Sequence, residues 1–108
     1  MEISFDDFAK VDIRTGTIEK AERVAKSDKL LKLDVNFGTL GSRVVLAGIG
    51  KSFEPEAVVG LTVLFVVNLA PRKMMGMESQ GMILAAPDAN GKLSLSTCPG
   101  VPAGVQIG

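Results

Sequence analysis

The sequence predicts a small all-β domain closed into a barrel, and three of its features support this prediction. Short apolar stretches that alternate with polar residues recur along the chain, which is typical of half-buried strands. Turn signals rich in glycine, proline and asparagine separate them, and helix signals occupy only short segments. No strand–helix–strand alternation is present, which excludes a parallel α/β sheet. The length of 108 residues fits one domain, which we expect to span residues 1–108.

The first part of the chain predicts a capped helix and then a long bent strand. Ser4 can cap a short helix that ends near Lys10, and we expect its two phenylalanines to pack on one end of the barrel. Residues 11–24 predict one strand, and the apolar alternation changes phase at Gly16, which indicates a β-bulge or sharp bend there. A long bent strand allows a small barrel to join its two sheets.

The middle of the chain predicts three more strands and one helical turn. Residues 31–37 form the clearest amphipathic strand, and 43–49 and 61–67 predict two further strands. Pro55 fits the first position of a helix and Gly60 its C-terminal cap, so we expect a single helical turn between the third and fourth strands.

The last part predicts a hairpin and an apolar tail. Residues 82–86 and the returning strand at 93–95 flank the Asn90–Gly91 dipeptide, a strong hairpin signal. The tail at 98–108 contains apolar residues, which we expect to pack against the barrel or a second subunit.

Composition excludes several classes of function. Histidine is absent, which removes histidine-based catalysis and most zinc sites. The single cysteine, Cys98, cannot form an internal disulfide, and no secretory signal or membrane-length apolar run is present. We therefore expect a cytoplasmic protein without membrane contact, catalytic residues, metal or cofactor. Hydrophobic residues make up 46% of this small chain, which makes self-association a reasonable hypothesis.

The stretch from Asn68 to Met82 is the candidate functional segment. It connects two predicted core strands and contains the adjacent cations Arg72 and Lys73, three clustered methionines and two glycines. Twelve cations and twelve anions cancel over the whole chain, so any affinity for RNA depends on where the charges lie. An ordinary solvated connection, with the methionines as core filler, is an open alternative at this point.

Four motifs, in this order, are similar to those of one family: FAKVDIRTG at 8–16, SDKLLKL at 27–33, NLAPRKMMG at 68–76 and SQGM at 79–82. The chain resembles the tRNA-binding OB-fold domain found at the C-terminus of bacterial methionyl-tRNA synthetases, which also exists as a stand-alone structure-specific tRNA-binding protein. The resemblance covers essentially the whole chain. It implies a five-stranded OB-fold barrel, a homodimer built by terminal extensions, the C-terminal one included, and non-catalytic binding to the folded shape of tRNA without a small-molecule substrate.

The resemblance also implies which residues form the RNA surface. Carried over by motif they are Asn68, Arg72, Lys73, Ser79 and Met82, with Lys32 and Arg43 as weaker additions. The adjacent cations would neutralise phosphates, and the asparagine and serine could hydrogen-bond phosphate or 2′-hydroxyl groups. Met82 is expected to pack the loop or to lie against a ribose or base. The chain has no tryptophan or tyrosine, which favours recognition of RNA shape over base stacking.

Two alternatives stay open. One is a peptide-binding chaperone dimer, because a related branch of this fold resembles the bacterial export chaperone CsaA, and the methionine-rich loop and apolar tail could line a peptide groove. The other is a module that only holds two catalytic subunits together.

Overall fold

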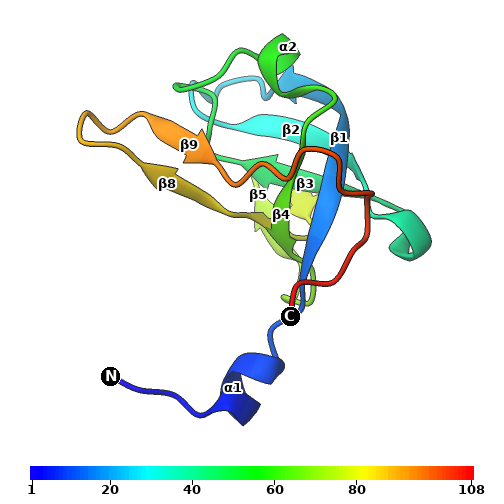
Figure 1. Cartoon of the computed structure of the whole chain (residues 1–108). Coiled ribbons are helices and arrows are strands. Elements are labelled where there is room, and N and C mark those ends of the chain that lie inside the picture. Colours follow the sequence, from blue (N-terminus) through cyan, green and yellow to red (C-terminus); the bar gives the residue numbers. More distant parts are fainter.

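The computed structural model describes all residues 1–108 and consists mainly of short strands around a curled five-stranded antiparallel sheet (Figure 1). The sheet has the strand order β3-β2-β1-β4-β7, and two further hairpins, β5–β6 and β8–β9, are attached to it. The elements are α1 (Phe5–Ala9), β1 (Ile13–Arg23), β2 (Leu31–Asn36), η1 (Gly38–Leu40), β3 (Ser42–Ala47), α2 (Pro55–Val58), β4 (Thr62–Val66), β5 (Arg72–Met74), β6 (Met77–Ser79), β7 (Met82–Ile83), β8 (Ala85–Pro87) and β9 (Leu93–Leu95). The predicted all-β class and both predicted helical segments are confirmed, and the arrangement is consistent with an OB-like fold. None of the helices is long and apolar enough to cross a membrane.

The core lies inside the curl of the sheet. Leu31, Leu33 and Val35 of β2 are fully buried, and the residues between them are partly exposed, as the alternation predicts. Phe37 and Phe65 meet edge to face at the centre, with ring centroids 5.2 Å apart. The interior therefore fixes which face of β2 points outward.

Strand β1 joins the two halves of the curled sheet, as the long predicted strand implies. Its first part, Ile13–Thr17, pairs with β4, and Thr17–Arg23 pairs with β2. The register shift, however, lies at Glu19, between Ile18 and Lys20. The prediction of a bulge at Gly16 is therefore wrong in its position.

Gly16 has a different physical role. It pairs regularly with Val63, and a Cβ at this position would lie 2.6 Å from the side chains of both Phe37 and Val35. A glycine is required because the core approaches the backbone closely. The phase change arises because Thr15 faces the C-terminal tail, where its hydroxyl donates to the Pro102 carbonyl at 2.7 Å.

The C-terminal tail runs along β1, but the expectation that its apolar residues are covered is met only in part, because Val105 and Ile107 are each 40% exposed. The Gly104 and Ile107 amides donate to the carbonyls of Thr15 and Ile13, at 2.7 and 2.8 Å. The predicted strand at 82–86 is divided in two. Its first part, β7, pairs with β4, and its second part, β8, pairs with β9 in a hairpin that projects from the body (Figure 1).

Helix α1 does not pack on the barrel end as expected. Ser4 caps it, because the Asp7 amide donates to the Ser4 hydroxyl at 3.1 Å. Phe5 and Phe8 nevertheless remain 79% and 46% exposed, and their rings lie 6.5 Å from each other. Figure 1 shows α1 hanging away from the sheet at the same end as the C-terminus. The helix has five residues and buries none of them, so its apolar side chains are left without a covering surface.

Candidate nucleic-acid interface

The two predicted phosphate-binding cations lie on the β5–β6 hairpin. Arg72 and Lys73 are both exposed, and neither takes part in an ion pair. Across the hairpin Arg72 stands opposite Ser79, and Lys73 stands opposite Glu78. Five of the twelve cations of the chain are within 4.0 Å of a carboxylate, so these two belong to the free positive charge of the surface.

Ser79 is brought next to these cations, but its side chain points into the protein. It is 3% exposed, and its hydroxyl accepts from the Leu46 amide at 3.0 Å and donates to the Gly81 carbonyl at 3.0 Å. Next to it, the Gln80 amide and side-chain oxygen bind the carbonyl and amide of Val44, at 2.8 and 3.1 Å. Ser79 and Gln80 thus hydrogen-bond the free edge of β3 and close the barrel through two side chains and one backbone amide in place of a regular ladder.

Asn68 is also occupied by contacts within the chain. Its side-chain amide donates to the Lys10 carbonyl at 2.6 Å, and its oxygen accepts from the Asp12 amide at 2.8 Å. This pair of hydrogen bonds ties the start of the loop to the connection between α1 and β1. Asn68 therefore anchors the segment that leads to the cations.

The two weaker candidates, Arg43 and Lys32, lie on neighbouring strands. The Arg43 guanidinium donates to the Val67 carbonyl at 2.7 Å and lies 5.9 Å from the centre of the Phe37 ring. Lys32 is 3.6 Å from the Glu22 carboxylate, and its side chain is 35% exposed. Both are therefore partly engaged within the protein, in contrast to the cations of β5.

The methionines of this region divide into packed and exposed ones. Met74 and Met77 pack against the small buried cluster of Val24, Leu30 and Leu46, whereas Met75 and Met82 are 52% and 46% exposed. Met82 lies on β7 opposite Val66, outside the hairpin. Met74 therefore acts as core filler, the alternative left open by the sequence, but Met75 is exposed to solvent at the hairpin tip.

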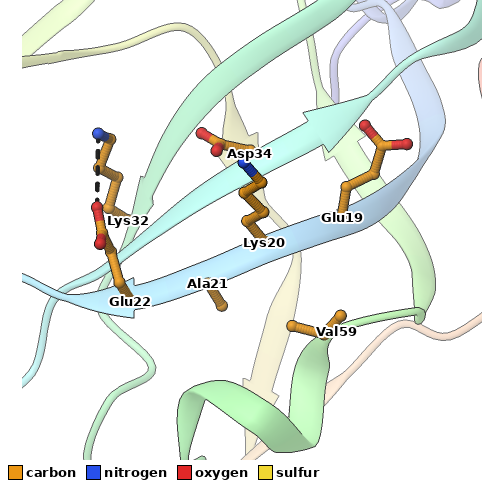
Figure 2. Close-up of a pocket in the computed structure, with 7 residues that line it drawn as sticks. All are labelled: Glu19, Lys20, Ala21, Glu22, Lys32, Asp34 and Val59. Atoms are coloured by element: carbon orange, nitrogen blue, oxygen red, sulfur yellow. Dashed lines mark ion pairs between the residues drawn. The ribbon is translucent and has the colours of Figure 1, made fainter.

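A shallow open groove of about 480 Å³ crosses the outer face of β1 and β2 (Figure 2). It is lined by Glu19, Lys20, Ala21, Glu22, Lys32, Asp34 and Val59. Because of the bulge at Glu19, Glu19 and Lys20 both point to this outer face, beside Asp34 of the neighbouring strand (Figure 2). Adjoining depressions share Lys32 and continue to the β5–β6 hairpin. Acids and cations are mixed in the groove, so its centre is not electropositive.

Six exposed cations of the chain have no ion pair. They are Lys20, Lys26, Lys29, Arg72, Lys73 and Lys92. Lys26 and Lys29 lie in the β1–β2 turn, which borders the same depression as the hairpin tip. Neither lysine is among the residues predicted from the sequence, although they fall in and beside the SDKLLKL motif. The chain has no group of three or more side chains able to hold a metal ion.

Comparison with known proteins agrees with this architecture. The model of a family described as a putative tRNA-binding domain matches residues 13–106. A methionine–tRNA ligase of Cytophaga hutchinsonii is 52% identical over 107 residues, which cover 98% of this chain and 15% of that protein. The crystal structure of a MetRS-related protein from Pyrococcus horikoshii superimposes with a TM-score of 0.92 at 39% identity, covering 99% of both chains.

The chaperone CsaA of Bacillus anthracis has a similar structure, with a TM-score of 0.90 at 29% identity and full coverage of both chains. The ligase relative is much longer than this chain, which corresponds to one small part of it. The family match extends over β1 to the C-terminal tail and thus includes the hairpin, the barrel closure and the groove. The chain therefore belongs to the family of putative tRNA-binding domains.

Proposed function

We propose that this chain is a non-catalytic module that binds the folded shape of tRNA through the free cations of the β5–β6 hairpin and the β1–β2 turn. The observation that carries the proposal is that Arg72 and Lys73 are exposed and without ion pairs. A two-stranded hairpin joined to the barrel by Ser79 holds them in place. Cations in this state can exchange their counterions for phosphates without first breaking a contact within the protein.

The distribution of aromatic residues supports recognition of shape. Phe37 and Phe65 are buried in the core, and Phe5 and Phe8 lie on α1, remote from the groove. No aromatic residue lines any of the depressions along the outer face of the sheet. Single-strand binders commonly stack bases on aromatic platforms, so backbone and shape contacts fit this surface better. In a relative such as the ligase of Cytophaga hutchinsonii, we propose that the corresponding part adds tRNA affinity to the enzyme.

The test is tRNA binding across a salt series with the Arg72→Ala/Lys73→Ala double variant. Each lost phosphate contact should reduce the slope of log K against log salt by about 1, so we expect a slope less steep by roughly 2 and weaker binding at low salt. Lys92→Ala is the matched control, because Lys92 is an exposed cation without an ion pair on the separate β8–β9 hairpin. A DNA hairpin and single-stranded RNA should compete poorly. An unchanged slope in the double variant would contradict the proposed site.

We also propose that the module works as a homodimer. Phe5 and Phe8 of α1 and Val105 and Ile107 of the tail are exposed, and α1 and the C-terminus lie at the same end of the molecule (Figure 1). Apolar side chains gathered at one end favour a second copy as their cover. Light scattering should give twice the mass of the 11.3 kDa chain, and Phe5→Asp/Phe8→Asp should give the monomer. A monomeric wild type at micromolar concentration would exclude the dimer.

A second candidate is a peptide-binding chaperone, favoured by the similarity to CsaA of Bacillus anthracis. The two functions make opposite predictions for the cations of β5. Suppression of aggregation that survives the Arg72→Ala/Lys73→Ala change, together with absent tRNA binding by the wild type, would select the chaperone.

A further inference from the structure

A small groove of about 310 Å³ lies between the tip of the β5–β6 hairpin and the β1–β2 turn. Its floor is apolar and consists of Val24, Ala25, Met75 and Met77, and three charged residues, Glu22, Arg23 and Lys32, stand at its border. Met77 also packs against the buried cluster beneath, so the floor is firmly supported. The groove is large enough for one flat ring or a comparable apolar group.

The two turns that border this groove contain the only two non-glycine residues of the chain with positive φ. Met75 has φ +52° and Lys26 has φ +66°. Such conformations cost of order 1 kcal/mol or more for a non-glycine residue and concentrate at binding sites. Met75 and Gly76 form a two-residue hairpin turn with positive φ at both positions, where asparagine is the favoured first residue. Methionine thus occupies a position where the turn itself does not favour it.

Cations outnumber acids around the groove, which favours an anionic ligand. Glu22 and Glu54 are paired with the border cations Lys32 and Arg23, and Asp28 is paired with Lys51. Lys26 and Lys29 are exposed and have no ion pair. Lys26 directly follows the floor residue Ala25 in the sequence, so the turn that contributes to the apolar floor also carries free positive charge. A nucleotide has both matching parts, a flat π-face and a phosphate, whereas an apolar peptide side chain would use only the floor.

We propose that this groove is a nucleotide subsite, in which one unstacked base of a folded RNA lies on Met75 and Met77. The phosphate of that nucleotide lies against Lys26 and Lys29. The subsite rests on the proposed tRNA-binding function and adds to it a specific contact, which selects RNAs that expose a base on their folded surface. Polarizable thioethers suit this task, since they adapt to any base without reading its edges.

The substitution Met75→Asn separates binding from folding, because asparagine suits the left-handed turn better than methionine. We expect the melting temperature to stay the same or to rise by about 3 °C. The affinity for tRNA should fall about fivefold, which lies within the range of a contact between a thioether and an aromatic ring. Met75→Leu is the matched control that keeps the apolar surface and should bind within twofold of the wild type. Equal tRNA affinity of Met75→Asn and the wild type would overturn the subsite.

A second measurement follows the methyl groups directly. In protein labelled at the methionine methyls, saturating tRNA should shift the Met75 and Met77 resonances upfield through the ring current of the base, and should leave Met1 unchanged. If Met75 does not shift while tRNA binding still depends on Arg72 and Lys73, the subsite is wrong and the proposed function holds. Absence of any tRNA binding would remove both. An apolar peptide that displaces tRNA and shifts the same methyls would overturn the subsite in favour of a peptide groove.

Discussion

Replacing Ser79 by alanine tests whether the SQGM motif serves the barrel or the RNA. The hydroxyl is buried and holds two backbone groups, the Leu46 amide and the Gly81 carbonyl, both at 3.0 Å. Leu46 is itself 4% exposed, so its amide would lose its partner in a place that water does not reach. A buried donor left without a partner costs about 1–3 kcal/mol. The Gly81 carbonyl adds less, because it is only partly buried and can accept a hydrogen bond from water. We expect Ser79→Ala to lower the free energy of unfolding by about 2 kcal/mol.

For a domain of this size, that loss corresponds to a fall in melting temperature of roughly 8–12 °C. Urea denaturation followed by circular dichroism measures it, and the m-value should not change. Ser94→Ala is the matched control, because Ser94 is exposed on β9, and its change should stay within about 0.5 kcal/mol. The slope of tRNA affinity against salt should equal that of the wild type at temperatures where the variant is folded. Unchanged stability of the variant, or a reduced salt slope at temperatures where the variant is folded, would refute the assignment of Ser79 to the barrel.

Two further substitutions test other positions that hold the site. Asn68→Ala removes the hydrogen bonds to the Lys10 carbonyl and from the Asp12 amide. Hydrogen exchange of the Asp12 amide should therefore accelerate by about tenfold, equivalent to roughly 1.4 kcal/mol. Unaltered exchange would show that the anchor is not needed. Gly16→Ala forces a methyl group to within 2.6 Å of the Phe37 ring, and should destabilise the fold by about 1–3 kcal/mol in thermal unfolding, whereas a neutral result would mean that the core gives way freely.

The fold could be predicted where a local pattern and the tertiary structure demand the same thing. Alternation along β2 reports directly on one buried face, and Pro55 at the start of α2 satisfies a purely local rule. The position of the bulge could not be predicted, because a glycine where the apolar alternation changes phase can mark either a bulge or a close approach of core side chains to the backbone. Only the contacts of Gly16 with Phe37 and Val35, which are distant in sequence, decide between them.

The location of the candidate site could be predicted from the sequence, but the role of each residue in it could not. Motif residues on one short stretch point to a common region, and the structure places Arg72, Lys73 and Ser79 together on one hairpin. Burial is not visible in a motif, however, so a serine that closes the barrel looks the same as a serine that could contact phosphate. Lys26 could not be predicted for a related reason. Its left-handed conformation results from the β1–β2 turn as a whole, and lysine is not a residue type that indicates such a conformation.

An electrically neutral chain can offer a surface for RNA where its free cations gather. Five cations are paired with five carboxylates, as Lys32 is with Glu22 and Arg23 with Glu54, which leaves seven cations and seven acids without an ion pair. Four of these free cations lie in the β1–β2 turn and on β5, and the β1–β2 turn and the β5–β6 hairpin together contain one free acid, Glu78. Net charge averages over the whole surface and so hides this local difference. Because attraction to phosphate decays within about 8–10 Å at physiological salt, the local surplus decides binding and the neutral total has little influence.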